Sequence, residues 1–63
     1  MSVTISEHDE EILLLAAEYG IAGAAQRENR SPQTVKNWLH MIYAELGARN
    51  MAHAVMILLL NKP

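Results

Sequence analysis

Four polar side chains in the middle of the chain have the chemistry needed to recognise the edges of base pairs. Gln33 and Asn37 carry amides, His40 carries an imidazole, and Lys36 carries an ammonium group. At about 100° per residue, these positions fall on one side of a helix. Amide and imidazole groups hydrogen-bond to base edges in the major groove, and an asparagine can bond adenine at two atoms together. The competing interpretation is the solvated back of an ordinary amphipathic helix.

The helix that positions these side chains is predicted over residues 32–46. Ser31 is a favoured N-cap, because its hydroxyl can accept a hydrogen bond from an amide of the first turn. Pro32 suits the first helical position, where its missing N–H costs nothing. Apolar residues recur every three or four positions and form one buried stripe: Val35, Trp38, Leu39, Ile42 and Leu46. Burial of the indole in this stripe is expected, with its N–H bonded to a partner.

Three further helices are expected on either side of this one. Ser6 and Asp9 resemble a capping box at the start of the first helix, and Gly20 suits its end. A turn at residues 21–23 then leads into a short second helix, and Asn50 caps the last helix. The expected bounds of the three are 6–19, 24–29 and 51–60. The fold class predicted for the chain is all-α, with four helices.

The length and composition limit the chain to one small domain of residues 1–63. Sixty-three residues lie near the lower limit for a self-sufficient core, and chains this short often depend on partner contacts. The absence of cysteine excludes a disulfide framework and thiol chemistry, and it is compatible with the cytoplasm. The longest apolar run, residues 51–60, is too short to span a bilayer. We therefore expect a cytoplasmic protein without a membrane segment.

The predicted helix over residues 51–60 is apolar on nearly all sides. A helix of this kind requires burial all round, and three other small helices can cover only one side of it. The apolar patch that remains predicts an interface, since exposed patches of this kind mark contact sites. The alternative is a terminal helix packed fully into the core.

The net charge of −2 conceals an uneven distribution of charged residues along the chain. Residues 1–18 contain five acidic residues and no basic one, whereas residues 19–63 contain five basic and two acidic residues. A nucleic-acid-binding surface needs a local basic face and not a basic total. This face is thin, so a monomer is expected to bind DNA only weakly through phosphates. Arg27 and Arg30 are expected near the phosphate backbone, or else on an ordinary solvated surface.

Residues for catalysis or metal binding are not grouped in this sequence. The histidines His8, His40 and His53 fall on separate predicted helices, without the spacing of a metal site. The sequence contains no glycine loop for phosphate, no nucleophile elbow and no recognisable Ser/His/Asp set. We therefore expect no enzyme activity, no cofactor and no bound metal.

Several of these features together resemble the LuxR/GerE-type helix-turn-helix domain. Residues 5–13 have the apolar, hydroxyl and acidic residues of that family's entry helix. The other matching residues follow in order through the second half of the chain: Ser31, Thr34-Val35-Lys36, Ile42, Leu46-Gly47, Asn50 and Ala54-Val55. The resemblance extends from Ile5 to Leu59, which is almost the whole chain.

The resemblance implies a stand-alone DNA-binding transcription regulator. The N-terminal half of the helix at 32–46 would enter the major groove of double-stranded DNA, and the helix at 51–60 would form a homodimer. The implied phosphate contacts are Ser31 and Thr34, and the implied base and backbone contacts are Lys36, Asn37 and His40. The full set of DNA-binding candidates is Ser31, Gln33, Thr34, Lys36, Asn37, His40, Arg27 and Arg30. The candidate dimer interface is Met51, Val55, Met56 and Leu59.

The chain also departs from the pattern of that family. The interval from Gly20 to Ser31 is about two residues shorter than in the family. His40 stands where family members carry a second basic residue, and Glu45 stands where they carry a lysine. Both departures weaken the attraction to phosphates, because fewer cations face the duplex.

Two other interpretations remain open from the sequence. The first is a helix-turn-helix-shaped protein-interaction module that binds a host regulator or RNA polymerase. It is favoured by the negative net charge, by Glu45 and by the thin basic face. A piece resembling region 4 of a sigma factor shares the Thr34-Val35-Lys36 core, but it explains residues 47–55 less well.

Overall fold

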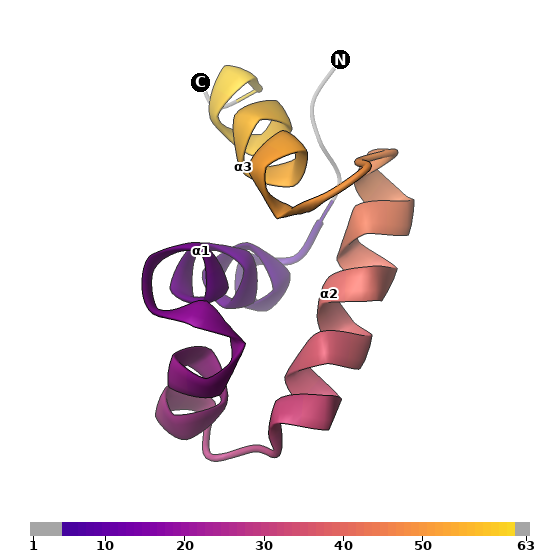
Figure 1. Cartoon of the computed structure of the whole chain (residues 1–63). Coiled ribbons are helices and arrows are strands. Elements are labelled where there is room, and N and C mark those ends of the chain that lie inside the picture. The colour runs from indigo at the N-terminus through magenta and orange to yellow at the C-terminus, as the bar shows by residue number, and fades with distance from the viewer. Residues whose placement is uncertain (1–4, 62–63) are drawn as a thin grey trace.

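The computed structural model describes residues 5–61 of the chain. Over this range the fold consists of three α-helices, which are α1 (Glu7–Glu28), α2 (Pro32–Leu46) and α3 (Met51–Leu60), and it has no strand. Figure 1 shows α2 along one side of the molecule, with α3 above α1. The predicted all-helical class is confirmed for the described residues. The predicted count of four helices is not confirmed, because the first two expected helices lie in one element, α1.

The chain changes direction at one glycine, without the loop that was expected between the first two helices, and this explains the difference in helix count. Gly20 has a φ of 80° and a ψ of 171°, and it interrupts the helical backbone inside α1. Figure 1 shows α1 changing direction part of the way along its length. Glycine adopts positive φ without the steric penalty of a Cβ, so one residue is enough to redirect the chain. The turn expected at residues 21–23 is therefore helical, and α1 consists of a first limb and a second limb on either side of Gly20.

The ends of the helices are set by local side-chain chemistry. The three predicted N-caps are confirmed: Ser6 accepts from the Asp9 amide at 3.1 Å, Ser31 from the Thr34 amide at 3.1 Å, and Asn50 from the His53 amide at 2.9 Å. Each bond satisfies an amide that the first turn of the helix leaves without an intrahelical acceptor. At the other ends, Asn29 and Gly47 take left-handed conformations and close α1 and α2.

All three helices contribute to one apolar core. Its buried residues are Ile12, Leu13, Ala16, Ala24, Ala25, Val35, Leu39, Ile42, Ala54 and Leu58. Three of the five residues predicted for the stripe on α2 are fully buried, and Trp38 and Leu46 pack against them as partly buried side chains. The stripe anchors α2 to both limbs of α1, and the opposite face of α2 is left exposed.

The last helix, α3, buries only one of its sides. Ala54 and Leu58 enter the core, and Met51 and Val55 pack against it as partly buried residues. Met56 and Leu59 are more than half exposed, and Leu60 is 76% exposed. An apolar face therefore remains on the outside of α3. No helix within residues 5–61 is both long enough and apolar enough to cross a membrane.

Candidate nucleic-acid interface

The exposed face of α2 contains the four side chains that were predicted to read base pairs. Gln33, Lys36, Asn37 and His40 are all exposed, on the side of the helix opposite the buried stripe. In Figure 1 the outer side of α2 is not covered by α1 or α3. The four residues lie within the first nine residues of α2, which begins at Pro32. The helix phase predicted from the sequence is thus confirmed in this region.

Two amides on this face are joined to each other. Gln33 donates a hydrogen bond from Nε2 to Asn37 Oδ1, with a length of 3.0 Å. The carbonyl oxygen of an asparagine has a second lone pair, and its amide nitrogen carries two donors. Asn37 therefore still offers an acceptor and a donor side by side, which is the pattern that adenine requires. The spacing of four residues allows this bond, because residues i and i+4 are neighbours on a helix.

The first turn of α2 presents hydroxyl groups beside backbone amides. Ser31 Oγ accepts from the Thr34 amide, and it lies 2.9 Å from Thr34 Oγ1. Ser31 is exposed and Thr34 is partly exposed. The amides and the dipole at the start of a helix favour negative charge. The start of α2 therefore combines hydroxyl groups with the positive end of the helix dipole.

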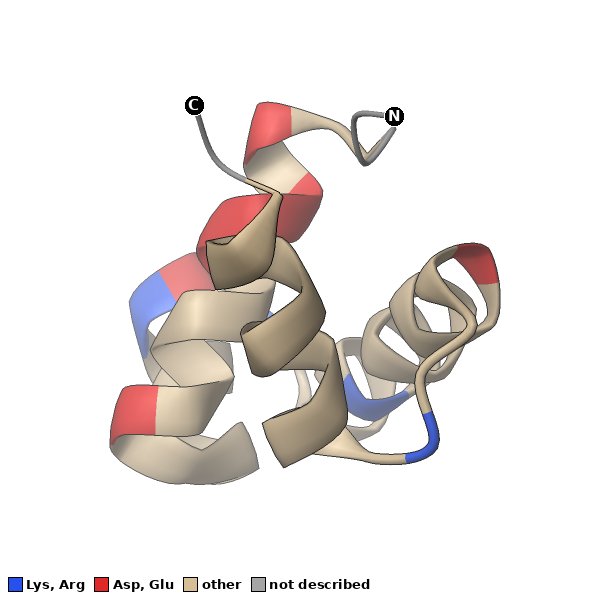
Figure 2. Cartoon of the chain, turned by 90° about the horizontal axis from the view of Figure 1, so that it is seen from above, with Lys and Arg blue, Asp and Glu red and all other residues tan. Residues whose placement is uncertain are grey.

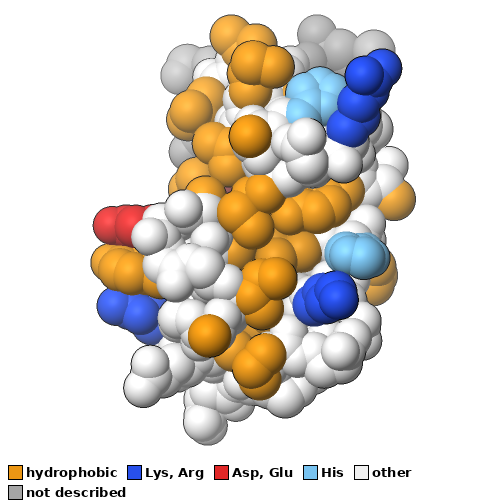
Figure 3. Space-filling view, viewed as in Figure 1, with side chains coloured by type: hydrophobic (Ala, Val, Ile, Leu, Met, Phe, Trp, Pro, Cys, Tyr) orange, Lys and Arg blue, Asp and Glu red, His pale blue; other side chains and the backbone are white. Residues whose placement is uncertain are grey.

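The two candidate arginines contact different parts of the molecule. The Arg27 guanidinium carbon lies 3.5 Å from the centroid of the Tyr19 ring, and Nη1 donates to the Gly23 carbonyl oxygen at 3.3 Å. Both partners belong to α1, so the structure holds Arg27 on α1. In Figure 3 a basic side chain over α1 lies on the opposite side of the view from the basic side chains over α2 and over the α2–α3 junction. The sequence spacing could not show this separation.

Arg30, in contrast, lies beside α2. Its guanidinium carbon is 5.9 Å from the centroid of the Trp38 ring. This distance is within the range of a weak cation–π attraction. Arg30 is exposed and directly precedes the N-cap Ser31. Of the two arginines, Arg30 is the one that adds positive charge near the start of α2.

Trp38 links α2 to the first turn of α1. The imidazole of His8 meets the Trp38 ring edge-on, with the ring centroids 5.4 Å apart. His8 Nε2 also lies 2.8 Å from Glu28 Oε1, so the start of α1 bonds to its last residue. These contacts join α2 to the first limb of α1, and the first limb to the second. Sequence reasoning missed His8 and Glu28 in this role, because contacts across twenty residues leave no local signal.

A further basic region lies at the junction of α2 and α3. The Arg49 amide donates to His53 Nδ1 at 3.1 Å, and therefore the neutral imidazole carries its proton on Nε2. A shallow hollow here is lined by Arg49, Asn50, Ala52, His53 and Met56. Figure 3 shows a histidine beside a basic side chain at two places on the visible face, one over α2 and one at this junction. Arg49 and His53 were not among the predicted contacts, and their grouping depends on the α2–α3 turn.

The acidic residues lie mostly away from the candidate face. Six of the seven acidic residues belong to α1, and Figure 2 shows them gathered along that helix. On α2 the charged residues are Lys36 and Glu45, nine positions apart. At 1.5 Å per residue this separation is about 13 Å, which exceeds the Debye length of about 10 Å at 0.1 M salt. Glu45 therefore has little effect on an anion bound at the start of α2.

One titrating group near this face is perturbed by its surroundings. Burial raises the pKa of the Tyr43 hydroxyl above its usual value, because the phenolate is poorly solvated there. The Tyr43 ring lies 6.2 Å from the His40 ring, centroid to centroid. Within residues 5–61, no three His, Asp or Glu side chains are grouped so that they could hold a metal ion.

Comparison with known proteins finds no family model, no curated protein and no solved structure that matches this chain.

Proposed function

We propose that this protein is a helix-turn-helix DNA-binding transcription regulator of the LuxR/GerE type, in which α2 reads the major groove. The observation that carries the proposal is the exposed Gln33–Asn37 amide pair on the outer face of α2. Exposed amides on a helix can hydrogen-bond to base edges in the major groove. Arg30 adds positive charge before this pair along the chain, and Lys36 adds positive charge between its two members.

The arrangement of α1 and α2 also supports this assignment. The second limb of α1 and α2 are joined by residues 29–31 and share the core through Ala24, Ala25 and Val35. Two helices joined by a short turn, with the second exposed on its outer face, are what a helix-turn-helix unit requires. In this scheme the two limbs of α1 take the places of the first two helices of the four-helix domain, and α2 is the recognition helix.

A homodimer formed through α3 belongs to the same proposal. Met56, Leu59 and Leu60 are exposed, and α3 carries no charged side chain that would oppose their burial. Met51 and Val55 are already packed against the core, so we place them at the edge of the interface and place Met56 and Leu59 at its centre. A dimer would double the number of phosphate contacts, which compensates for the thin basic face of one copy.

The proposal is tested by fluorescence anisotropy with a labelled pool of random duplexes, titrated at low and at moderate salt. The folded wild type is expected to bind at low salt and to weaken as salt rises. Lys36→Ala should lower the slope of log affinity against log salt by about one per protomer. The matched control is Arg27→Gln, which removes the same charge from α1, where Arg27 stacks on Tyr19. The control should leave that slope unchanged.

The outcome that overturns the proposal is equally direct. If the wild type is folded by circular dichroism but binds no duplex pool at low salt, α2 does not read DNA. The protein-interaction module then becomes the better assignment. The concentration of acidic residues on α1 is the observation that favours that second candidate.

A further inference from the structure

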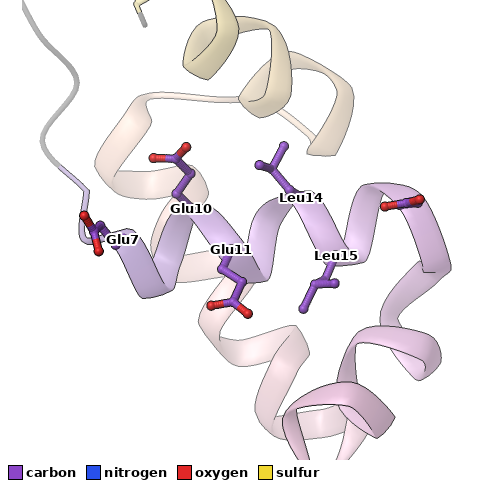
Figure 4. Close-up of a pocket in the computed structure, with 6 residues that line it drawn as sticks. Glu7, Glu10, Glu11, Leu14 and Leu15 are labelled. Carbon is purple, nitrogen blue, oxygen red and sulfur yellow. The ribbon is translucent and has the colours of Figure 1, made fainter.

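The outer face of the first limb of α1 combines apolar and acidic side chains around a shallow hollow. The hollow has a volume of about 410 Å³ and is lined by Glu7, Glu10, Glu11, Leu14, Leu15 and Glu18. Leu14 is 36% exposed, and Leu15 is partly buried. Figure 4 shows Glu10 and Leu14 on one side of the helix, toward α3, and Glu11 and Leu15 on the other side. Two leucines are thus bordered by carboxylates along the helix.

We call this surface the acidic leucine face; Leu15 at its edge packs against the core, whereas Leu14 is on its exposed part. The side of α1 that enters the core carries Ile12, Leu13 and Ala16. At about 100° per residue, Leu14 and Glu18 fall on the opposite side of the helix. The face therefore lies on the far side of α1 from α2 and would remain accessible while α2 contacts another molecule.

The stability of α1 does not account for all of these carboxylates. Glu7, Asp9 and Glu10 lie in the first turn, where the helix dipole favours negative charge. Glu11 repels Glu7 one turn away, and like charges at this spacing destabilise a helix. Glu18 lies near the end of the first limb, where the dipole favours cations instead. Glu11 and Glu18 would be stabilised by cations from outside the chain.

We propose that the acidic leucine face binds a basic amphipathic helix of a partner protein. Leu14 and Leu15 would contact apolar residues in the middle of that helix, and the carboxylates would pair with its Lys or Arg side chains. Glu7 and Glu18 are eleven residues apart, which corresponds to about 16 Å along a helix. The partner helix should therefore carry basic residues about three turns apart, with apolar residues between them.

The charge of the face excludes the other common occupants. Duplex DNA and an anionic membrane surface are both repelled by four carboxylates, so neither matches the face. Within residues 5–61, a second copy of this chain offers Arg27, Arg30, Lys36 and Arg49, which are spread over α1, α2 and the segments that follow them and form no basic row of the required length. The inference concerns α1 alone and does not depend on DNA binding by α2.

The test uses the whole chain and a synthetic fluorescent peptide as the probe. The peptide is a capped amphipathic helix of about four turns, with two central leucines and lysines about three turns apart. Anisotropy titration at low salt should show saturable binding to the wild type. Glu11→Lys and Glu18→Lys should each weaken binding by about three- to ten-fold. The matched control is Glu45→Lys, which makes the same change of charge on α2 and should have little effect.

Two further measurements locate the interaction. Amide chemical shifts of the protein should change along residues 7–18 when the peptide is added. A peptide with glutamates in place of lysines should bind Glu11→Lys/Glu18→Lys better than it binds the wild type. Leu14→Ala should weaken the binding of the lysine peptide to the wild type and the binding of the glutamate peptide to the double variant. Both peptides retain their leucines.

Three results would overturn the proposal. The first is equal affinity of the peptide for the wild type and Glu11→Lys. The second is shift changes confined to α3, which would place the peptide on the apolar face of that helix. The third is dissociation of a wild-type dimer by Glu11→Lys in sedimentation velocity, which would make the occupant a second copy.

Discussion

The side-chain amide of Gln33 holds that of Asn37 through a 3.0 Å hydrogen bond on the outer face of α2. Both residues are exposed, so the bond orders two side chains that would otherwise sample several rotamers. Ordering before contact reduces the entropy that is lost when a ligand binds. A pre-ordered amide pair is therefore suited to a ligand that requires a fixed donor and acceptor.

Replacement of Asn37 by alanine should remove recognition of one base pair. We expect Asn37→Ala to lose about 1–3 kcal/mol of discrimination at that position, since a bidentate amide–adenine pair contributes this much. Affinity for a random duplex pool should change much less. The measurement is competition between a selected duplex and its single-base variants. Equal weakening on every duplex would show instead that Asn37 contacts only the backbone.

A second prediction concerns the contact between His8 and Trp38. Trp38 is the only tryptophan, and the His8 ring meets it edge-on at 5.4 Å between centroids. Because the imidazole lies against the edge of the indole, we expect His8→Gln to change the intensity or the wavelength of the Trp38 emission in the folded protein. His53→Gln replaces a histidine on α3 and should leave the emission unchanged. Unchanged emission in folded His8→Gln would contradict the contact.

The third prediction concerns the close approach of Gly23 to Tyr19. A Cβ at Gly23 would lie 2.6 Å from the Tyr19 Cβ, which no relaxed structure accommodates. Glycine to alanine in a helix interior ordinarily stabilises by about 1 kcal/mol. Here we expect Gly23→Ala to destabilise by about 1–3 kcal/mol, because a methyl group is forced into a packed site. Urea unfolding monitored by circular dichroism measures the change.

A double variant provides the control for this effect. Tyr19→Gly removes the atom that an alanine at position 23 would meet, so Gly23→Ala should be much less harmful in that background. The difference between the two backgrounds is a coupling energy of the kind that contacting residues show. A stabilising effect of Gly23→Ala in the wild-type background would mean that the two limbs of α1 are not packed this closely.

Much of the fold could be predicted from local chemistry alone. Ser31 followed by Pro32, and Asn50 before an apolar run, are helix starts whose signal lies within a few residues. The bounds of α2 and α3 follow from these signals, and so does the exposed face of α2. Gly20 was predicted as a helix end. Local chemistry could not decide between a loop and a kink there, because a glycine at positive φ is compatible with both.

The same limit applies to the candidate site. The spacing of Gln33 and Asn37 predicts that they share a face, and the structure adds the bond between them. Arg27 was grouped with the DNA contacts by its position in the chain, yet its guanidinium stacks on Tyr19. His8 and Glu28 come together only because α1 folds back at Gly20. Contacts of this kind depend on the direction that the chain takes after Gly20. Residue types alone do not specify that direction.

The fourth prediction is a loss of stability at high pH. Burial raises the pKa of Tyr43 above 10.0, the value for an exposed tyrosine, so the folded state holds this proton more tightly than the unfolded state. The associated stability is fully present below the unfolded pKa and is lost as pH rises through the folded one. Tyr43→Phe should reduce this loss in urea unfolding experiments on either side of pH 10. The same loss in wild type and variant would assign it to other groups.

The last prediction is a homodimer held by the exposed face of α3. Leu59 is 58% exposed and Met56 is 53% exposed, and burying such side chains in a second copy contributes about 25 cal/mol for each Å² of apolar surface. A carboxylate at position 59 would be buried without a partner in that interface, so Leu59→Glu should dissociate the dimer. Sedimentation velocity over a concentration series measures the oligomeric state, and circular dichroism checks that the variant remains folded. Gln26→Glu adds the same charge at an exposed position on α1 and should leave the dimer intact.

A wild type that stays monomeric at high concentration would refute the dimer. The DNA-binding proposal would then have to rely on the cations of a single copy.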